Sequence, residues 1–311
     1  FFISLRTMEN MIRVASSEGI DIYCPADGKF SFFNSPYFAH RNFIGIDIYP
    51  NLGFGEVAPS PVSGEVIGVR EVGFFESRSF ECSSKDYVIL MKSLENKRRI
   101  IKIIHVKPIV KVGEKVIVGG ELGSLIRSGF FDFWTEPHIH VEVKDPSNPL
   151  RARGGYKIRR VMQIDENEME GSIADGSLSG LVIESKSEYS LIALNHDLRY
   201  GLPVDLNGKI GFIDGGIPHY GFFGVHTNFT PEVGDSVKFL GGKIGSVVSV
   251  FENMALCSME RHNLTFKING KSVRLSLYLY PSKPKMKIVP YKIGQLNLQK
   301  FEKVSLTLNL R

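Results

Sequence analysis

Cysteine is scarce in this chain, and the three that occur, Cys24, Cys82 and Cys257, are far apart. No Cys-x-x-Cys pair is present, which excludes a zinc ribbon, and an odd, scattered set does not support a disulfide framework. The count leaves room for one disulfide. The expected role of these cysteines is that of small buried apolar side chains.

Long hydrophobic runs are also missing. No stretch of 18 apolar residues occurs, so the sequence predicts no membrane-spanning helix. The opening residues 1–5 are too short for the core of a signal peptide. With 43% hydrophobic and 23% charged residues, the composition is typical of a soluble globular protein, and it indicates neither a compartment nor an oligomeric state.

Charge of one sign is only slightly in excess, since 38 basic residues against 33 acidic ones give a formal net charge of +5. Two basic clusters occur, at residues 97–99 and 283–287, and neither is interleaved with aromatic residues as in a nucleic-acid motif. The sequence therefore predicts no nucleic-acid partner and only a mild attraction to acidic polymers.

Helical patterns are sparse, and only residues 8–17 suggest one or two short amphipathic helical turns. In contrast, 31 glycines and 22 phenylalanines point to many turns and short strands. At 311 residues the chain is long enough for about two domains. We therefore predict a mainly β protein.

The most informative stretch is residues 137–143, which read Pro-His-Ile-His-Val-Glu-Val. In a strand, His138 and His140 point to one side, about 7 Å apart along the chain, while the apolar residues between and after them face the other side. Two imidazoles on one face suit a metal site or an acid/base site. The alternative is two half-exposed histidines on an ordinary strand.

The segments before this strand carry a specific order of turns and polar residues. Residues 59–68 and 112–123 are glycine-rich turns next to β-branched residues, which mark short strands. His105 stands shortly before the second of these turns. Asp47 lies among apolar neighbours in the short strand predicted at 45–48, and a buried carboxylate needs a hydrogen-bonding or metal partner.

In this order, the segments resemble the lysostaphin/LytM-type zinc metalloendopeptidases, which cut peptide cross-links in bacterial cell walls. The resemblance covers roughly residues 37–146, and the His-x-His strand is its most specific part, because biotinyl and lipoyl carriers share the glycine turns. It implies a duplicated-hybrid-motif β-sandwich or barrel, a zinc cofactor, and a peptide or cell-wall-like polymer as substrate.

The same resemblance implies roles for individual residues. Asp47 and His140 would be zinc ligands, while His105 and His138 would flank the metal-bound water, orient it and stabilise the tetrahedral oxyanion. Three protein ligands and one water are the usual set of a catalytic zinc, which lowers the pKa of that water to about 7. Glu142 points the same way as His140 and is either an outer partner of that ligand or a plain strand-face carboxylate.

One position departs from the family pattern. The first family ligand is a His four residues before the Asp, and Phe43 stands there in this chain. His40, three residues earlier, becomes the substitute ligand if a bulge or loop takes up the extra residues; otherwise it is a surface histidine beside Arg41. If no third ligand is recruited, the chain keeps the fold and loses the metal.

The second half contains an echo of the first. Val-Gly-Asp-Ser-Val at 233–237 repeats Val-Gly-Glu-Lys-Val at 112–116, and each copy is followed by a Gly-Gly turn and preceded by a histidine, His226 or His105. Repeats on this scale suggest duplication. His219 and His226 are more simply structural residues than metal ligands. His262 lies near the place of a second His-x-His strand, but its partner histidine is absent.

These patterns predict three parts: an N-terminal segment (residues 1–36) that packs on the first domain, a LytM-like domain (37–153), and a second β domain (156–311), interpreted as a diverged duplicate. Within the last part, Asn269-Gly270 predicts a hairpin turn, residues 214–221 a loop, and residues 165–171 an exposed acidic loop.

Three function classes follow. The first is a zinc metallopeptidase; the second is a catalytically inactive peptidase-fold protein that acts as a binding or scaffold module. The third is a carrier or phosphotransfer module, which shares this kind of β-architecture but lacks a carrier lysine at a hairpin tip here. The position of His40 relative to Asp47 distinguishes the first two classes.

Overall fold

A computed structural model of the chain describes residues 10–164, 176–260 and 264–310. The chain divides into two compact units. Unit 1 comprises Phe1–Phe30 and Tyr37–Met162, and unit 2 comprises Ser31–Pro36 and Gln163–Arg311. His262 and the acidic loop predicted at 165–171 lie outside the described residues.

The mainly β prediction is confirmed, because strands dominate both units and the described part of the chain has one short helix, α2 (Phe38–Arg41). The predicted helical turns at 8–17 are wrong over the described residues, since Met11–Ser17 form strand β1. The reason is tertiary: β1 pairs with a strand on each side, and the backbone hydrogen bonds of that sheet outweigh a weak helical pattern.

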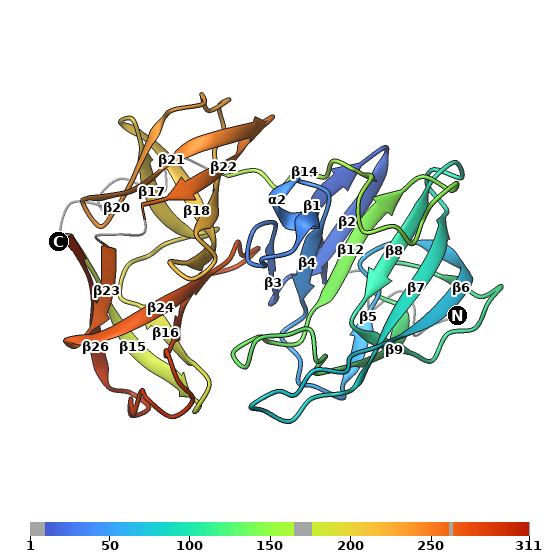
Figure 1. The fold of residues 1–311 in the computed structure, drawn as a ribbon. Helices are drawn as coiled ribbons and strands as arrows, with labels where there is room; N and C mark the ends of the chain where they lie inside the picture. The colour runs from blue at the N-terminus through green and yellow to red at the C-terminus, as the bar shows by residue number, and fades with distance from the viewer. Residues whose placement is uncertain (1–9, 165–175, 261–263, 311) are drawn as a thin grey trace. The chain divides into compact units, whose positions relative to one another are not determined.

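Unit 1 contains the first fourteen strands and α2 (Figure 1). The strands are β1 (Met11–Ser17), β2 (Ile20–Pro25), β3 (Lys29–Ser31), β4 (Ile46–Tyr49), β5 (Val57–Pro59), β6 (Gly64–Gly73), β7 (Lys85–Ser93), β8 (Ile100–Ile104), β9 (Val106–Pro108), β10 (Lys115–Val116), β11 (Glu121–Leu125), β12 (Ile139–Lys144), β13 (Gly155–Tyr156) and β14 (Arg159–Arg160).

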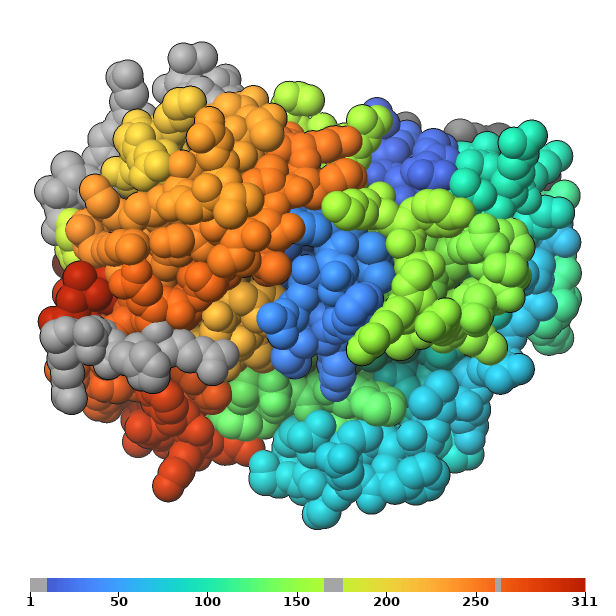
Figure 2. All heavy atoms as spheres, turned by 45° about the horizontal axis from the view of Figure 1, so that its top comes forward, coloured from blue at the N-terminus to red at the C-terminus, as the bar shows by residue number. Residues whose placement is uncertain are grey.

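The main sheet of unit 1 has the order β10-β6-β7-β8-β12-β4-β3, with β13 paired to β12. Two three-stranded sheets accompany it, β14-β1-β2 and β5-β11-β9. The pairing of β14 with β1 carries unit 1 on to Met162, beyond the predicted boundary at 153. Figure 2 shows the blue atoms of the first strands beside green atoms of the chain near residue 150.

Strand β12 lies between β8 and β4 and is buried on both faces. Its alternation places Ile139, Val141 and Val143 on one side, where none of the three is accessible to solvent. His140, Glu142 and Lys144 share the other side. A strand buried on both faces thus carries three ionisable side chains, which have to find partners within the protein.

Unit 2 consists of β15 (Ser177–Ser185), β16 (Ser190–Leu194), β17 (Leu202–Leu206), β18 (Lys209–Ile217), β19 (Phe222–His226), β20 (Ser236–Phe239), β21 (Gly242–Phe251), β22 (Met254–Met259), β23 (Leu264–Ile268), β24 (Lys271–Leu277), β25 (Lys285–Val289) and β26 (Lys303–Leu310).

These strands form one twelve-stranded sheet that closes on itself twice. Pairing of β17 with β18 completes a ring of six strands, and pairing of β24 with β25 completes a second ring of six. The hairpin turn predicted at Asn269-Gly270 is confirmed between β23 and β24, with φ of 46° and 81°. The loop predicted at 214–221 is only partly correct, because β18 extends to Ile217.

The segment Ser31–Pro36 belongs to the core of unit 2 although unit 1 residues flank it in sequence. The buried Asp214 carboxylate accepts hydrogen bonds from Ser31 Oγ at 2.5 Å and from the Phe32 backbone N–H at 2.7 Å. Phe33 packs against Gly224, where a Cβ atom would overlap its ring. The predicted N-terminal segment 1–36 is thus shared between the two units.

In the described part of the chain, no helix has the length and apolar character needed to cross a membrane.

Candidate functional site

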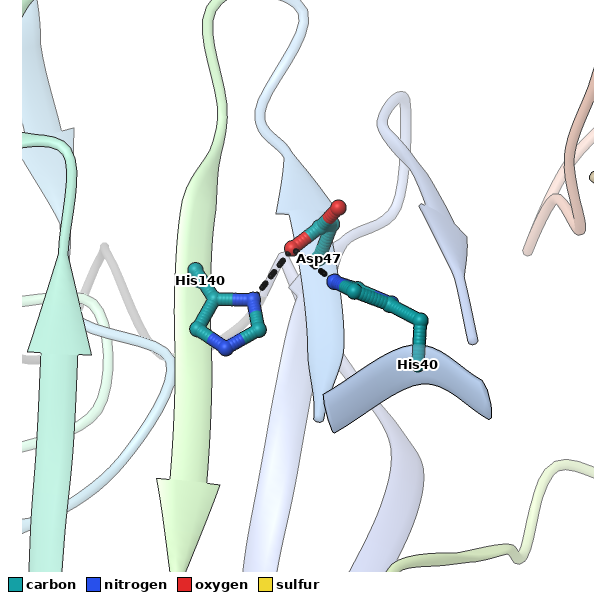
Figure 3. A group of neighbouring side chains, drawn as sticks. All are labelled: His40, Asp47 and His140. Atoms are coloured by element: carbon teal, nitrogen blue, oxygen red, sulfur yellow. Dashed lines mark hydrogen bonds and ion pairs between the residues drawn. The ribbon is translucent and has the colours of Figure 1, made fainter. Parts of the chain in front are cut away.

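Three buried side chains of unit 1 gather at the start of β12: His40, Asp47 and His140 (Figure 3). Asp47 and His140 are direct cross-strand partners of β4 and β12, and His140 Nδ1 lies 2.7 Å from Asp47 Oδ1. His40 Nε2 lies 3.5 Å from the same oxygen. One donor atom from each residue lies within 4.8 Å of the other two. Donors of a tetrahedral zinc site are about 3.3–3.6 Å apart. The distance from His40 to Asp47 lies in this range, whereas the shorter contact between His140 and Asp47 is a hydrogen bond that would have to open for a metal.

The turn at the C-terminal end of α2 brings the His40 side chain close to Asp47. The Ile44 N–H donates to Ala39 O at 3.0 Å, and Phe43 takes a left-handed φ of 60°. This closure of the helix is a Schellman motif, in which glycine is more usual than phenylalanine. The turn takes up the three extra residues and directs the Phe43 side chain away from Asp47. The buried Phe43 ring lies under Lys157, with Nζ 5.5 Å from the ring centroid.

Gly45 leaves the space that the His140 ring fills. A Cβ atom at Gly45 would lie 2.7 Å from His140 Cε1 and 2.9 Å from Ala39 Cβ. Real side chains do not approach this closely, so any other residue here would displace His140 or α2. The backbone between helix and strand is therefore shaped around the imidazole.

A buried ion-pair cluster lies on the other side of His140. Glu142 Oε1 is 3.4 Å from His140 Nε2 and accepts a hydrogen bond from Lys102 Nζ at 2.8 Å. Lys144 Nζ approaches Glu142 Oε2 to 2.7 Å, an ion-pair distance at an angle unsuited to a hydrogen bond. Lys102 is the cross-strand partner of Glu142 on β8. Buried charges are costly unless paired, and here each carboxylate has cationic or N–H partners.

His138 and His105 form a second pair beside the first group, with ring centroids 4.9 Å apart. His138 Nδ1 donates to the Glu136 carbonyl at 3.0 Å, so its Nε2 carries a lone pair. His105 Nδ1 donates to Asp86 Oδ2 at 2.6 Å. Each imidazole is thus fixed in orientation by a partner on Nδ1.

The electrostatics separate the two histidines of β12. Burial lowers the pKa of His138 to about 4 despite the nearby Asp47 charge, so it is neutral at pH 7. Burial opposes charge on His140 as well, but hydrogen bonds with Asp47 and Glu142 raise the pKa of His140 to about 9. For Asp47 the cost of burial is outweighed by His40, His138 and His140, which hold the pKa of the carboxyl below its usual range.

All five residues predicted for the site lie in unit 1 and converge: His40, Asp47, His105, His138 and His140. Sequence reasoning missed Asp86, Lys102 and Lys144, which come into place only through strand register. Among the described residues, His219 and His226 of unit 2 belong to no group of three or more donors with metal spacing.

Comparison with known proteins gives few matches. Residues 21–160, under half of the chain, match a family described as the N-terminal domain of a domain of unknown function, DUF8155. No curated protein matches.

Two solved structures show similarity. One, from Pseudomonas aeruginosa, carries the description peptidase M23; it is 22% identical, with 46% of this chain and 53% of that chain covered and a TM-score of 0.26. The other is the solution structure of lysostaphin, 15% identical, with 85% and 92% covered and the same TM-score of 0.26. The present chain thus spans about half the length of the Pseudomonas protein, and at these TM-scores neither likeness bears on function.

Proposed function

We propose that unit 1 holds one zinc ion with His40, Asp47 and His140 and hydrolyses peptide bonds, with His105 and His138 as catalytic residues. The observation that carries this proposal is the position of His40, which supplies the third donor that Phe43 cannot. Two imidazoles and a carboxylate are a donor set that zinc prefers. His140 Nδ1 and Asp47 Oδ1 share a hydrogen bond in the metal-free site, and zinc would displace that proton on binding.

When bound, zinc would supply a Lewis acid that polarises the scissile carbonyl and acidifies water. The neutral His138, with its free lone pair on Nε2, accepts the proton of the attacking water. His105, as an imidazolium whose Nδ1–H is held by the Asp86 carboxylate, would donate a hydrogen bond from Nε2 to the oxyanion as it forms. Glu142 keeps the His140 ring oriented with Nδ1 toward Asp47. By the sequence resemblance, the substrate is a peptide of the cell-wall type.

The first test is the zinc content per chain, measured by elemental analysis of protein purified without chelator. We expect about one zinc per chain and its loss in Asp47→Ala, because the ligand set has three members. Protein with zinc should cleave cell-wall-type peptides, and His138→Ala should keep the metal and lose activity by about 10²–10⁴-fold.

No zinc, even after incubation with excess metal, would contradict the proposal. It would favour the second candidate, a peptidase-fold binding module. One observation speaks for that candidate: His40, Asp47, His138 and His140 are all at most 6% exposed, whereas a polymer substrate has to reach the reacting groups.

A further inference from the structure

Phe131 packs against both proposed catalytic histidines, and Tyr49 packs against one of them, His138, with ring centroids 4.9 Å apart. The Phe131 ring stacks on His138 with centroids 4.6 Å apart and meets the edge of His105 at 4.7 Å. Phe131 is only 4% exposed, although it lies in the loop between β11 and β12 and not in a strand. Its ring therefore packs on polar imidazoles at ordinary van der Waals contact, and no substrate atom fits between them.

The loop that carries Phe131 is held by side-chain hydrogen bonds and by backbone hydrogen bonds to Ser83 and His105. Ser128 Oγ donates to Asp86 Oδ2 at 2.5 Å, Arg78 Nε to Gly129 O at 2.8 Å, and Tyr37 OH to Phe130 O at 2.8 Å. No strand is present from residue 126 to residue 138. The backbone hydrogen bonds join the loop to Ser83 and His105, which lie outside the strands, so lifting residues 126–135 breaks no strand pairing. Near the end of the loop, the partly buried ion pair between Glu136 and Lys29 Nζ, at 2.6 Å, fixes the point about which it would lift.

The strongest of these ties is shared with the site. Asp86 Oδ2 accepts both from Ser128 Oγ and from His105 Nδ1. The carboxylate that orients one proposed catalytic histidine is thus also the anchor of the loop that covers it. The Asp86 carboxylate therefore both holds the loop closed and orients His105.

We propose that Phe131 is an intramolecular plug: the 126–138 loop closes the His105–His138 side of the site, and a peptide substrate enters only when this loop lifts. The role in catalysis rests on the proposed peptidase function, but the closure does not. Peptide is the occupant that the plug excludes, since it has to approach the imidazoles that the Phe131 ring now covers.

The test is the rate at which diethyl pyrocarbonate modifies His138 in the full, metal-free chain, followed by mass spectrometry with the half-buried His196 as internal standard. Phe131→Ala should raise the rate at His138 by about tenfold or more, because the ring no longer stabilises the closed loop. The matched control is Phe130→Ala, since the neighbouring ring faces Phe74 at 5.0 Å and covers no histidine. It should leave the rate within about twofold.

An unchanged rate in Phe131→Ala would overturn the plug, and so would an equal rise in both variants. If Phe131→Ala does not fold by circular dichroism, Ser128→Ala decides, because it loosens the loop and leaves the ring in place; a rise at His138 supports the plug and no rise overturns it. With zinc bound, Phe131→Ala should also increase kcat/KM for peptides. A chain that binds no zinc would refute the peptidase and still report on the plug, because the modification needs no metal.

Discussion

The two units contain the same local turn and use it in different surroundings. In unit 1, the Glu114 N–H donates to Lys111 O and Gly113 has φ of 93°. In unit 2, the Asp235 N–H donates to Glu232 O and Gly234 has φ of 98°. In both, the acidic side chain accepts from the first backbone N–H of the turn. The repeat seen in the sequence is thus also a repeat of backbone conformation.

The histidines that precede the two turns differ in what surrounds them. His105 pairs with Asp86 and lies 4.9 Å from His138, next to a group of metal-type donors. His226 pairs with Asp214 at 3.2 Å, and the rings of Phe32 and Phe33 lie 5.3 and 5.7 Å from it. Both members of the second pair are completely buried. A His–Asp pair alone is therefore no sign of a site; the neighbouring donors decide.

Replacement of one histidine in each unit should give the largest difference. His140→Ala should weaken zinc binding by more than about a hundredfold, because loss of even an outer partner costs 10–100-fold in metal affinity. His226→Ala should destabilise unit 2 and leave one zinc per chain. Isothermal titration with zinc measures both. Retained stoichiometric zinc in His140→Ala, or its loss in His226→Ala, would break the comparison.

The pH dependence of stability should also distinguish the site. In metal-free protein, His140 has a pKa of about 9 against an ordinary 6.5, so the folded state binds more protons between these values. Its contribution is complete below pH 6.5 and is lost as pH rises through about 9. His138, with a pKa of about 4, acts in the opposite sense and makes stability rise between pH 4 and 6.5.

We therefore expect the free energy of unfolding to be greatest near pH 6.5 and to fall by about 1–3 kcal/mol toward pH 9. Urea titrations at a series of pH values measure this, and His140→Ala should lose the fall on the alkaline side. A wild-type profile that is flat from pH 6.5 to 9 would remove His140 from the charged pair with Asp47.

The smallest effect should be the same in both units. Gly113→Ala and Gly234→Ala each force a Cβ onto a left-handed backbone without any clash, so each should cost about 1–2 kcal/mol in thermal or urea unfolding. Gly68→Ala is the control, because that glycine has open space and an ordinary φ; it should change stability by less than about 0.5 kcal/mol. Unequal costs at the two turns would show that the copies are less alike than their hydrogen bonds indicate.

The sequence was sufficient for the strands that carry the site. Alternation in residues 137–143 and the apolar neighbours of Asp47 predicted β12 and β4, and the structure makes His140 and Asp47 direct cross-strand partners. His40 could be named from sequence as a candidate, but its route to Asp47 depends on a four-residue helix and a left-handed phenylalanine. Residue propensities predict neither feature: a four-residue helix is too short to leave a periodic pattern, and phenylalanine is an unusual residue at the left-handed position after a helix.

Register and loops account for what the sequence could not predict. Lys102 meets Glu142 because β8 and β12 pair in one particular register, and a shift of one residue would turn its side chain to the other face. Asp86 lies at the start of β7, 19 residues from His105 and 42 from Ser128 in sequence. Phe131 lies in a loop whose path depends on side-chain hydrogen bonds, and these leave no periodic pattern in the sequence.

The passage of Ser31–Pro36 through unit 2 has an evolutionary consequence. A gene segment encoding only residues 163–311 would specify a core without Phe32 and Phe33, and would leave Asp214 without two of its hydrogen-bond donors. One recombination event cannot exchange either unit intact, because the chain enters unit 2 twice. Exchange of either unit intact would therefore need more than one crossover, and a domain-shuffled relative would have to carry its own version of these six residues.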